Sequence, residues 1–341
     1  MEFANFVCKF GSNLNLLDLL EEILLPAFLD TSLKREISET SYFFHNVRLL
    51  EVSDGNTSLT TIVGHLVKNT VLRRTQIFDS TLGLVADEQA IPSAPSALFV
   101  LVLNNHRLAY FRETSSAPTL QSFGSATRKF IREKYAEFYD QTLAERTRMV
   151  PSPTARNMAD LRRALSIEIP RPMVDVIPLA SEASLQEFID QFDLISAVTI
   201  NLEATNNEID NDKFFVALRE QSAKIGSTDT ALRHRNSEGL SKSETRSQVK
   251  SAVLQGTSRV SLTGKDAEGD KLSGSNDDFR VRVPFNGDSE DEDGVAKIMV
   301  ATLMRLFRKN VVRKANSDGA ETSKLKRIFS RFQHADDPST N

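Results

Sequence analysis

A run of fourteen residues, Arg259 to Leu272, places cations on a predicted hairpin. Residues 259–263 alternate between polar and apolar side chains, which is the period-two pattern of a half-buried strand. Asp266 and Gly269 then fit a β-turn, because Asp accepts bonds from the turn's own N–H groups and Gly tolerates a positive φ. Lys265 stands at the edge of this turn, where its ammonium group can project beyond the sheet towards a phosphate. A solvated surface lysine is the plainer alternative.

Further cations lie close to the hairpin in the sequence. Residues 279–285 alternate between apolar and polar positions, so a strand there would carry Arg280 and Arg282 on one face. If this strand pairs beside the hairpin, the two arginines share a surface with Arg259 and Lys265. Other cations end a predicted strand or lie four apart on a predicted helix: Arg233, Arg235, Arg246 and Lys250. These eight residues are the candidate DNA-binding set, because clustered cations bind phosphates without reading sequence.

Residues that would suit catalysis are scattered along the chain. A nucleophile with its base, a metal-binding set of carboxylates or a phosphate-binding loop does not occur at a recognisable spacing. Lys265 with Asp266 is the nearest nuclease-like pair, and it lacks a further acidic partner at motif distance. His45 and His65 have no companion ligands at metal-site spacing. The sequence therefore favours a binding protein over an enzyme, with no metal, cofactor or small-molecule substrate.

The composition is that of an ordinary globular protein, with 40% hydrophobic residues in a chain of 341. This length allows a sizeable core in two domains or in one elaborated domain. No run approaches the roughly 20 apolar residues of a membrane span, and the first residues lack a signal-peptide pattern, so we expect a cytoplasmic protein. The single cysteine, Cys8, alternates with apolar neighbours and is expected to be a buried strand thiol.

Charge is unevenly distributed along the chain. The formal net charge is −4, so DNA binding must depend on local clusters of cations rather than on the total. An acidic block spans residues 288–293, and a basic segment follows it as far as Arg331. Charge runs of this kind are usually solvated faces or disordered tails. We expect residues 316–341 to form a flexible tail that is first basic and then acidic.

The predicted elements divide into two α+β domains, each with a mixed sheet and flanking helices. Residues 1–150 contain the early strands and a long helix over 125–146, and the apolar strand 97–103 should be central in its sheet. Prolines between residues 151 and 180 indicate a linker. Residues 181–315 form the second domain, which carries the hairpin.

Two runs of the chain resemble the RexA family, the cytoplasmic half of the lambda phage Rex exclusion system. The first run is similar to that family's S-L-x-x-K-D-x-x-G-D-x-L pattern through Ser261-Leu262, Lys265-Asp266, Gly269-Asp270 and Leu272. The second run is similar through Asp87-Glu88, Pro95-Ser96, Leu98-Phe99-Val100 and a return strand containing Ala109 and Arg112. Both runs occur in the family's order with a similar separation, and a weaker similarity lies at Ser41-Tyr42.

This resemblance implies an α+β homodimer that binds DNA without sequence preference, in a fold related to RdgC. It also implies a prophage-type antiviral role, in which the protein senses DNA or protein–DNA complexes of an invading phage and signals to a separate RexB-like membrane protein. Carried over by position, the lysine of the family's K-D pair is Lys265. A family arginine two residues earlier is Thr263 here, so Arg259, Arg280 or Arg282 would have to compensate for it.

Two other functions fit the same sequence. An RdgC-like DNA clamp would keep the fold and would restrain recombination or block nucleases. A protein–protein adaptor would instead bind an acidic partner through the basic segment after Val312. Deletion of that segment separates the adaptor from the DNA-binding hypotheses, because DNA binding driven by the hairpin should survive the deletion.

Overall fold

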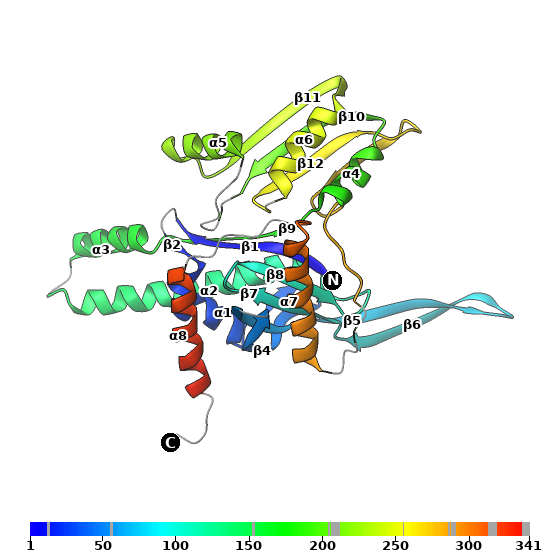
Figure 1. Ribbon diagram of the computed structural model, residues 1–341. Helices are drawn as coiled ribbons and strands as arrows, with labels where there is room; N and C mark the ends of the chain where they lie inside the picture. Colours follow the sequence, from blue (N-terminus) through cyan, green and yellow to red (C-terminus); the bar gives the residue numbers. More distant parts are fainter. Residues whose placement is uncertain are drawn as a thin grey trace.

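The computed structural model describes the chain from Met1 to Asn341 apart from residues 12–13, 55–56, 152–153, 204, 206–211, 255, 286, 288–290, 313–318 and 336–341. It is a mixed helix-and-strand protein with two antiparallel sheets (Figure 1). The predicted combination of sheets and flanking helices is therefore confirmed. Part of the predicted acidic block and both ends of the predicted tail lie outside the described residues.

The larger sheet comes mainly from the first third of the chain. Its strands are β1 (Glu2–Phe10), β2 (Leu14–Asn15), β3 (Arg35–Ile37), β4 (Thr40–Asp54), β5 (Thr57–Asp79), β6 (Gly83–Ser93), β7 (Ser96–Val102), β8 (Arg107–Arg112) and β9 (Pro172–Pro178). The strand order is β2-β1-β8-β7-β5-β4-β3, with β6 paired to β5 and β9 paired to β1. The apolar strand β7 lies between β8 and β5 and is buried at six of its seven residues, which confirms its predicted central position.

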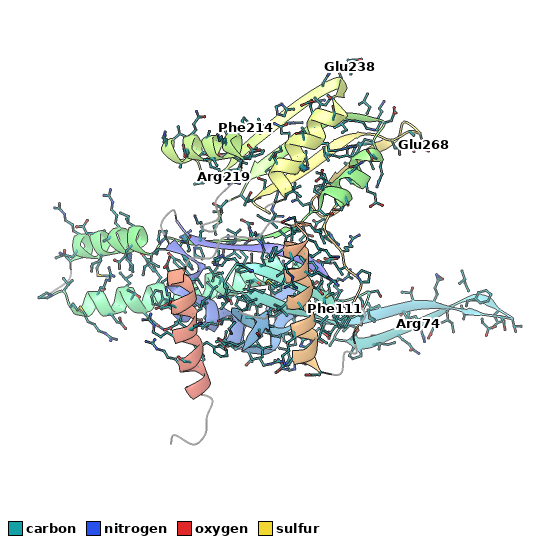
Figure 2. The ribbon with its side chains drawn as sticks, in the orientation of Figure 1. Arg74, Phe111, Phe214, Arg219, Glu238 and Glu268 are labelled. Atoms are coloured by element: carbon teal, nitrogen blue, oxygen red, sulfur yellow. The ribbon has the colours of Figure 1, made fainter. Side chains whose placement is uncertain are left out.

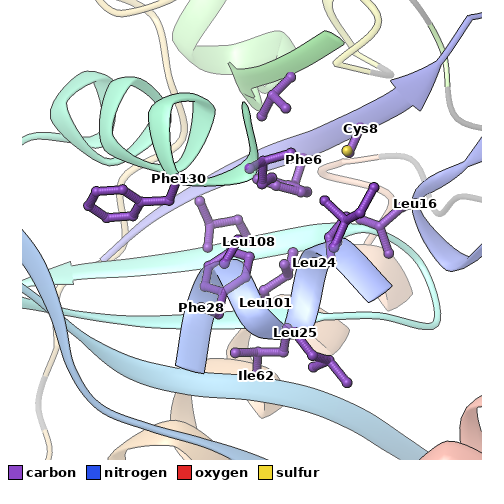
Figure 3. Packing of buried hydrophobic residues seen from close by; sticks show 14 of the residues in the cluster. Phe6, Cys8, Leu16, Leu24, Leu25, Phe28, Ile62, Leu101, Leu108 and Phe130 are labelled. Carbon is purple, nitrogen blue, oxygen red and sulfur yellow. The ribbon is translucent and has the colours of Figure 1, made fainter. Parts of the chain in front are cut away.

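Helices cover both faces of the larger sheet. One face packs against η1 (Leu16–Leu19), η2 (Leu20–Leu24), α1 (Leu25–Leu29) and α2 (Leu120–Arg148), and α3 (Ala155–Glu168) lies against α2. In this core, the ring of Phe28 lies 6.3 Å from that of Phe6 between centroids (Figure 3). It also lies 5.8 Å from the ring of Phe99. Cys8 is buried in the same core, as predicted, and burial raises the pKa of its thiol. The other face is covered by α7 (Glu292–Arg308).

The turn between β7 and β8 places a histidine inside the molecule. His106 has a φ of +54° and is 5% exposed. Its Nε2 atom has no hydrogen-bond partner within the described part of the chain. Burial, helped by the neighbouring Arg107 guanidinium, lowers the pKa of His106 from 6.5 to about 4. Protonation of this side chain therefore opposes the folded state.

We expect the substitution His106→Asn to reduce the loss of stability in mild acid. Because the folded pKa lies below the unfolded one, the unfolded chain takes up this proton first, and stability falls as the pH drops from about 6.5 towards about 4. Protonation of His106 in the unfolded chain should remove roughly 2–3 kcal/mol of folding stability by pH 4.5. Asn is a suitable replacement because it tolerates the positive φ. Urea unfolding of both proteins at pH 7 and pH 4.5 measures it. An equal loss of stability in both proteins would contradict this assignment.

The smaller sheet forms a second unit with its own core. Its strands are β10 (Leu194–Leu202), β11 (Thr230–Leu240), β12 (Ser258–Lys265) and β13 (Lys271–Ser275), in the order β11-β10-β12-β13. Its helices are α4 (Glu182–Asp190), α5 (Lys213–Lys224) and α6 (Lys242–Val253). Figure 1 shows α6 lying across one face of this sheet. Val249 of α6 is buried there with Val198 and Leu262 of the strands.

The segment predicted as a linker is part of the larger unit instead. Residues 151–180 contain α3 and β9, and β9 pairs with β1 from Ala4↔Pro178 to Phe10↔Pro172. The two prolines stand at the ends of this strand, where a missing N–H group is tolerated. The linker prediction is therefore wrong for β9, because Pro172 and Pro178 begin and end a strand and do not lie in a connection.

The predicted second domain, residues 181–315, is also divided differently. After β13 the chain returns to the larger sheet, where Arg282 forms a bridge to Glu2 and the N–H of Val283 donates to the carbonyl of Met1 at 3.0 Å. Helix α7 then buries Met299 and Leu303 against that sheet. Within the described part of the chain, the helices and strands of the smaller unit thus come from residues 182–275. Contacts distant in sequence decide this boundary, so local composition does not reveal it.

Residues 319–335, predicted as part of a flexible tail, form helix α8 (Gly319–Ala335). Leu325 and Ile328 are buried in the core around α1 and α2, in the i, i+3 spacing of an apolar helix face. Lys324 pairs with Asp18 at 3.6 Å, and Arg331 pairs with Glu21 at 3.3 Å. The tail prediction is therefore wrong for this segment, because its basic residues are interleaved with a buried apolar stripe.

Candidate nucleic-acid interface

The predicted hairpin exists as β12 and β13. The carboxylate of Asp266 accepts hydrogen bonds from the N–H groups of Glu268 and Asp270, at 3.1 and 2.8 Å. Gly269 has a φ of +85°, in the left-handed region that glycine adopts without steric cost. The two roles predicted for this turn are confirmed. The turn thus fixes the register in which Lys265 lies opposite Lys271.

One face of the smaller sheet is open. The strand register places the same-face residues in rows, such as Arg235, Ala197, Thr263 and Ser273 from β11 to β13. The outward positions hold mainly cations, hydroxyl side chains and small residues, with one leucine beside Lys265. They are Ala231, Arg233 and Arg235 on β11, Leu194, Ala197, Thr199 and Asn201 on β10, Arg259, Ser261, Thr263 and Lys265 on β12, and Lys271, Ser273 and Ser275 on β13. We call this surface the open face.

The opposite face of the same sheet is apolar and covered. Val198, Ile200 and Leu262 are buried against α6. His234, whose side chain points to this covered face, lies 3.2 Å from Gln248 of α6 between its Nε2 atom and the amide nitrogen. The alternation of the strands thus separates an apolar core from a cationic surface.

Four cations on the open face are available to a ligand. Arg233, Arg235, Lys265 and Lys271 are exposed and make no ion pair with any described residue. Arg233 and Arg235 lie on the edge strand β11, and the two lysines lie at the turn end of β12 and β13. Standard strand spacing and rise place the arginines roughly 12–20 Å from the lysines. Ala197, Thr263 and Ser273, in the row of Arg235, lie between Arg233 and the lysines, and this row supplies two hydroxyl groups.

Two acidic side chains lie at one end of this surface, the end that carries Lys265. Glu268 lies at the outer end of the hairpin and Glu238 lies near the far end of β11 (Figure 2). Asp266 is already engaged by the N–H groups of its own turn. A polyanion bound to the open face would therefore be favoured on the sheet side of these two acids, between the arginines and the lysines.

Lys271 is absent from the sequence-based set, although it lies opposite Lys265. The signal that identifies it is the continuation of the alternation after the turn, with polar side chains at residues 271 and 273 on either side of Leu272. Applied to the return strand, the same period-two argument that selects Lys265 also selects Lys271.

Arg259 lies on the open face but is bound within the chain. Its Nε atom lies 3.0 Å from the carboxylate of Glu203, and an Nη atom donates to the carbonyl of Val176 at 3.0 Å. Asp175 of β9 lies 3.6 Å away and also pairs with Arg128 of α2, at 3.3 Å. Burial raises the pKa of Glu203, Asp175 raises it further, and Arg259 opposes the shift. Arg259 therefore connects the two sheets.

Arg280 and Arg282 do not lie beside the hairpin, contrary to the pairing considered from the sequence. Their segment forms single bridges to Ala180 and to Glu2 of β1. Arg280 is mostly buried and pairs with Glu2 at 3.0 Å and with Asp277 at 3.3 Å. Arg282 is exposed and lies 3.8 Å from Glu2. The expected common surface with Lys265 is therefore not formed, because this segment pairs with the larger sheet.

Arg246 and Lys250 share one helix face, as predicted, but α6 covers the side of the sheet opposite to the open face. Arg246 pairs with Asp190 at 2.5 Å, and Lys250 pairs with Glu182 at 2.6 Å. Both acids belong to α4, so these cations hold two helices together. Their removal would take two cations from the sheet's covered side and leave the open face unchanged.

Across the described ranges, no group of three or more His, Cys, Asp or Glu side chains is arranged to hold a metal ion. None of the helices that the structure describes has both the length and the apolar character to cross a membrane. Fold and site thus define a mixed helix-and-strand protein with an open cationic sheet face. A scan against protein-family models and a search of curated proteins found no match to the chain.

Proposed function

We propose that this protein binds DNA through the phosphate backbone, without sequence preference, on the open face of the smaller sheet. The observation that carries the proposal is the set of four exposed cations, Arg233, Arg235, Lys265 and Lys271, on one rigid surface. Guanidinium and ammonium groups attract phosphates, and Ser and Thr hydroxyls donate hydrogen bonds to phosphate oxygens. Contacts of this kind position a nucleic acid and carry no base information.

The shape of the open face suits a backbone ligand. Its central strand presents the small side chains of Ala197, Thr199 and Asn201, while the longer cations stand at both sides. A polyanion can therefore approach the middle of the sheet closely and be held from both sides. Each neutralised phosphate releases condensed counterions, which is the main source of affinity in sequence-independent binding.

In the cell, we propose that the protein acts in phage exclusion. The resemblance to the RexA family supports this role at Lys265-Asp266 and Gly269-Asp270, which form the turn beside the proposed site. In this proposal a homodimer senses DNA or protein–DNA complexes of an invading phage and signals to a separate membrane protein. Phage plating on cells with and without that membrane protein tests the proposal. Protection should require the membrane protein, since a DNA clamp acting alone would protect no cells.

The adaptor hypothesis depends on a basic C-terminal segment that is free to bind a partner. In α8, Lys324 and Arg331 already pair with Asp18 and Glu21, and Leu325 is buried. These contacts favour a structural role for the described part of that segment. They leave the open face as the stronger candidate for recognition.

A salt series tests the proposed DNA binding. Binding of the intact protein to two random duplexes of different sequence should show the same affinity, and log K should fall linearly with log salt. Four phosphate contacts predict a slope of roughly −3.6. Fluorescence anisotropy at four or more salt concentrations measures it. No detectable binding at low salt, or an affinity that follows sequence, would contradict the proposal.

A further inference from the structure

A cavity lies at the junction between the larger and the smaller unit. Its volume is about 550 Å³, which is within the range of roughly 300–1,000 Å³ that small-molecule sites occupy. Its walls come from β3, β4, the start of α2, β9, β12 and the segment after β13. Figure 1 shows β9 on the side of the larger unit that faces the smaller one. Sites for small ligands are frequent at such junctions between two parts of a protein.

Arginines from three separate elements line this cavity. They are Arg35 of β3, Arg128 of α2 and Arg259 of β12. The lining also contains two acids, Asp175 and Asp277, so three cations face two carboxylates. Asp277 is paired with Arg280, which lies outside the lining, at 3.3 Å. The cavity therefore favours an anionic ligand, because its arginines are only partly neutralised.

Two of these arginines are anchored and still have donors to offer. Arg128 donates from its Nε atom to a carbonyl of β9 and from one Nη atom to Asp175, at 3.0 and 3.3 Å. Arg259 donates to another carbonyl of β9 and pairs with Glu203, both at 3.0 Å, and it shares Asp175. The remaining Nη atom of each guanidinium group has no partner within the described ranges. Groups that are already anchored lose little freedom when they bind a ligand.

Arg35 is the arginine with the fewest contacts. Its guanidinium group forms no hydrogen bond or ion pair with any residue that the structure describes. The central carbon of this group lies 5.8 Å from the centre of the Tyr42 ring, and the two residues are paired on β3 and β4. This cation–π contact orients the side chain without using its N–H groups. Arg35 can therefore bind two phosphate oxygens through parallel hydrogen bonds.

The first turns of α2 supply further donors. Gln121, Ser122 and Ser125 line the cavity with one amide and two hydroxyl groups. The first turn of the helix contains no acidic residue, so no carboxylate there cancels the positive end of the helix dipole. Apolar contacts come from Leu120 and Pro178. The cavity thus combines donors for an anion with an apolar wall for an organic group.

We propose that this cavity binds a phosphorylated small molecule, whose phosphate is held by Arg35, Arg128 and Arg259. A phosphate monoester has three terminal oxygens and a charge of about −1.5 to −2 at neutral pH, which suits donors that come from three elements. A carboxylate has two oxygens and a single charge, and one guanidinium group suffices to bind both oxygens. Since the cavity is larger than a phosphate group, the organic part of the ligand would lie against Leu120 and Pro178.

The ligand would connect the two units. Arg35 and Arg128 belong to the larger unit and Arg259 to the smaller one, so a phosphate bound by all three adds contacts across the junction. The lining includes none of the four exposed cations proposed to bind DNA. The inference therefore goes beyond the proposed function and does not depend on it, and a titration without DNA tests it separately.

Isothermal titration calorimetry at constant ionic strength tests the proposal, with inorganic phosphate, AMP and adenosine as probes. Phosphate and AMP should bind, AMP more tightly, whereas adenosine should not bind because it has no phosphate. Arg35→Ala should weaken AMP binding at least about tenfold, because charged hydrogen bonds are lost. The matched control is Arg132→Ala, which removes an exposed arginine of α2 outside the lining. No binding of phosphate or AMP at millimolar concentration, or equal weakening by the control, would overturn the proposal.

A second variant blocks the cavity without changing its charge. Ser125→Phe places a ring in the space at the start of α2, and it should abolish AMP binding. Circular dichroism and urea unfolding show that both variants remain folded, which we expect for Arg35→Ala because that side chain has no ion pair among the described residues to lose. AMP binding that survives Ser125→Phe in the folded protein would place the ligand elsewhere and contradict the proposal.

A terminal phosphate of DNA offers the same chemistry as a phosphorylated small molecule. Duplexes that end in a phosphate or in a hydroxyl group separate the two sources. We expect both duplexes to bind equally well, with and without Arg35→Ala, because the DNA lies on the open face. A preference for the phosphorylated end that Arg35→Ala removes, in a protein that does not bind AMP, would assign the cavity to DNA ends and overturn the proposal.

Discussion

Replacing all four available cations of the open face by alanine should abolish most of the DNA affinity of this protein. The variant combines Arg233→Ala, Arg235→Ala, Lys265→Ala and Lys271→Ala. An exposed pair of opposite charges contributes up to about 1 kcal/mol, so the loss of four phosphate contacts should weaken binding on the order of 100-fold. The salt slope should flatten by roughly 3.6 units, because four fewer counterions are released.

The two pairs of cations can be separated. Arg233→Ala with Arg235→Ala removes the β11 side of the surface, and Lys265→Ala with Lys271→Ala removes the hairpin side. Each double variant should flatten the slope by roughly two units. If only the lysine pair has an effect, the DNA lies along the hairpin alone and does not cross the sheet.

A matched control keeps the change in net charge equal. Arg246→Ala with Lys250→Ala also removes two cations, but from α6 on the covered side of the sheet. We expect the salt slope of this variant to stay unchanged, although the lost pairs with Asp190 and Glu182 reduce stability slightly. Equal weakening in the control and in an open-face double variant would show that net charge, and not this surface, drives binding.

The hairpin could be predicted because its information is local. Alternation of side chains over residues 259–263, an Asp at the start of the turn and a Gly at its end are sufficient to define two strands and their register. The register then decides which cations share a face, so Lys265 is correctly placed on an exposed sheet surface. The central position of β7 could be predicted for a similar reason, since a continuous apolar run requires cover on both faces.

The other cations could not be placed in this way, because their positions depend on contacts distant in sequence. Arg280 pairs with Glu2, which lies 278 residues earlier, and Arg259 reaches back to Val176 of β9. Arg246 appears as a good candidate in the sequence, since nothing local shows that α6 covers the apolar side of the sheet. Local spacing reveals which residues share an element, whereas tertiary packing decides which surface that element presents.

A substitution late in the sequence should cause a large loss of stability, because the chain returns to the larger sheet after β13. Leu303 of α7 is fully buried against strands from the first third of the chain, close to Val63 and Val100. We expect Leu303→Ala to lower the free energy of unfolding by about 2–5 kcal/mol, through lost burial and the cavity left behind. For a unit of this size, the melting temperature should fall by roughly 5–15 °C.

The control for this prediction lies on the same helix. Arg305 is exposed two residues further along α7, so Arg305→Ala should change stability by no more than about 0.5 kcal/mol. Urea unfolding followed by circular dichroism compares the two variants with the intact protein. If residues 181–315 formed a separate domain, Leu303→Ala would leave the unfolding of the larger sheet unchanged. Because α7 completes the core on one side of that sheet, we expect β7 and its neighbours to unfold together with the helix, at the lower denaturant concentration.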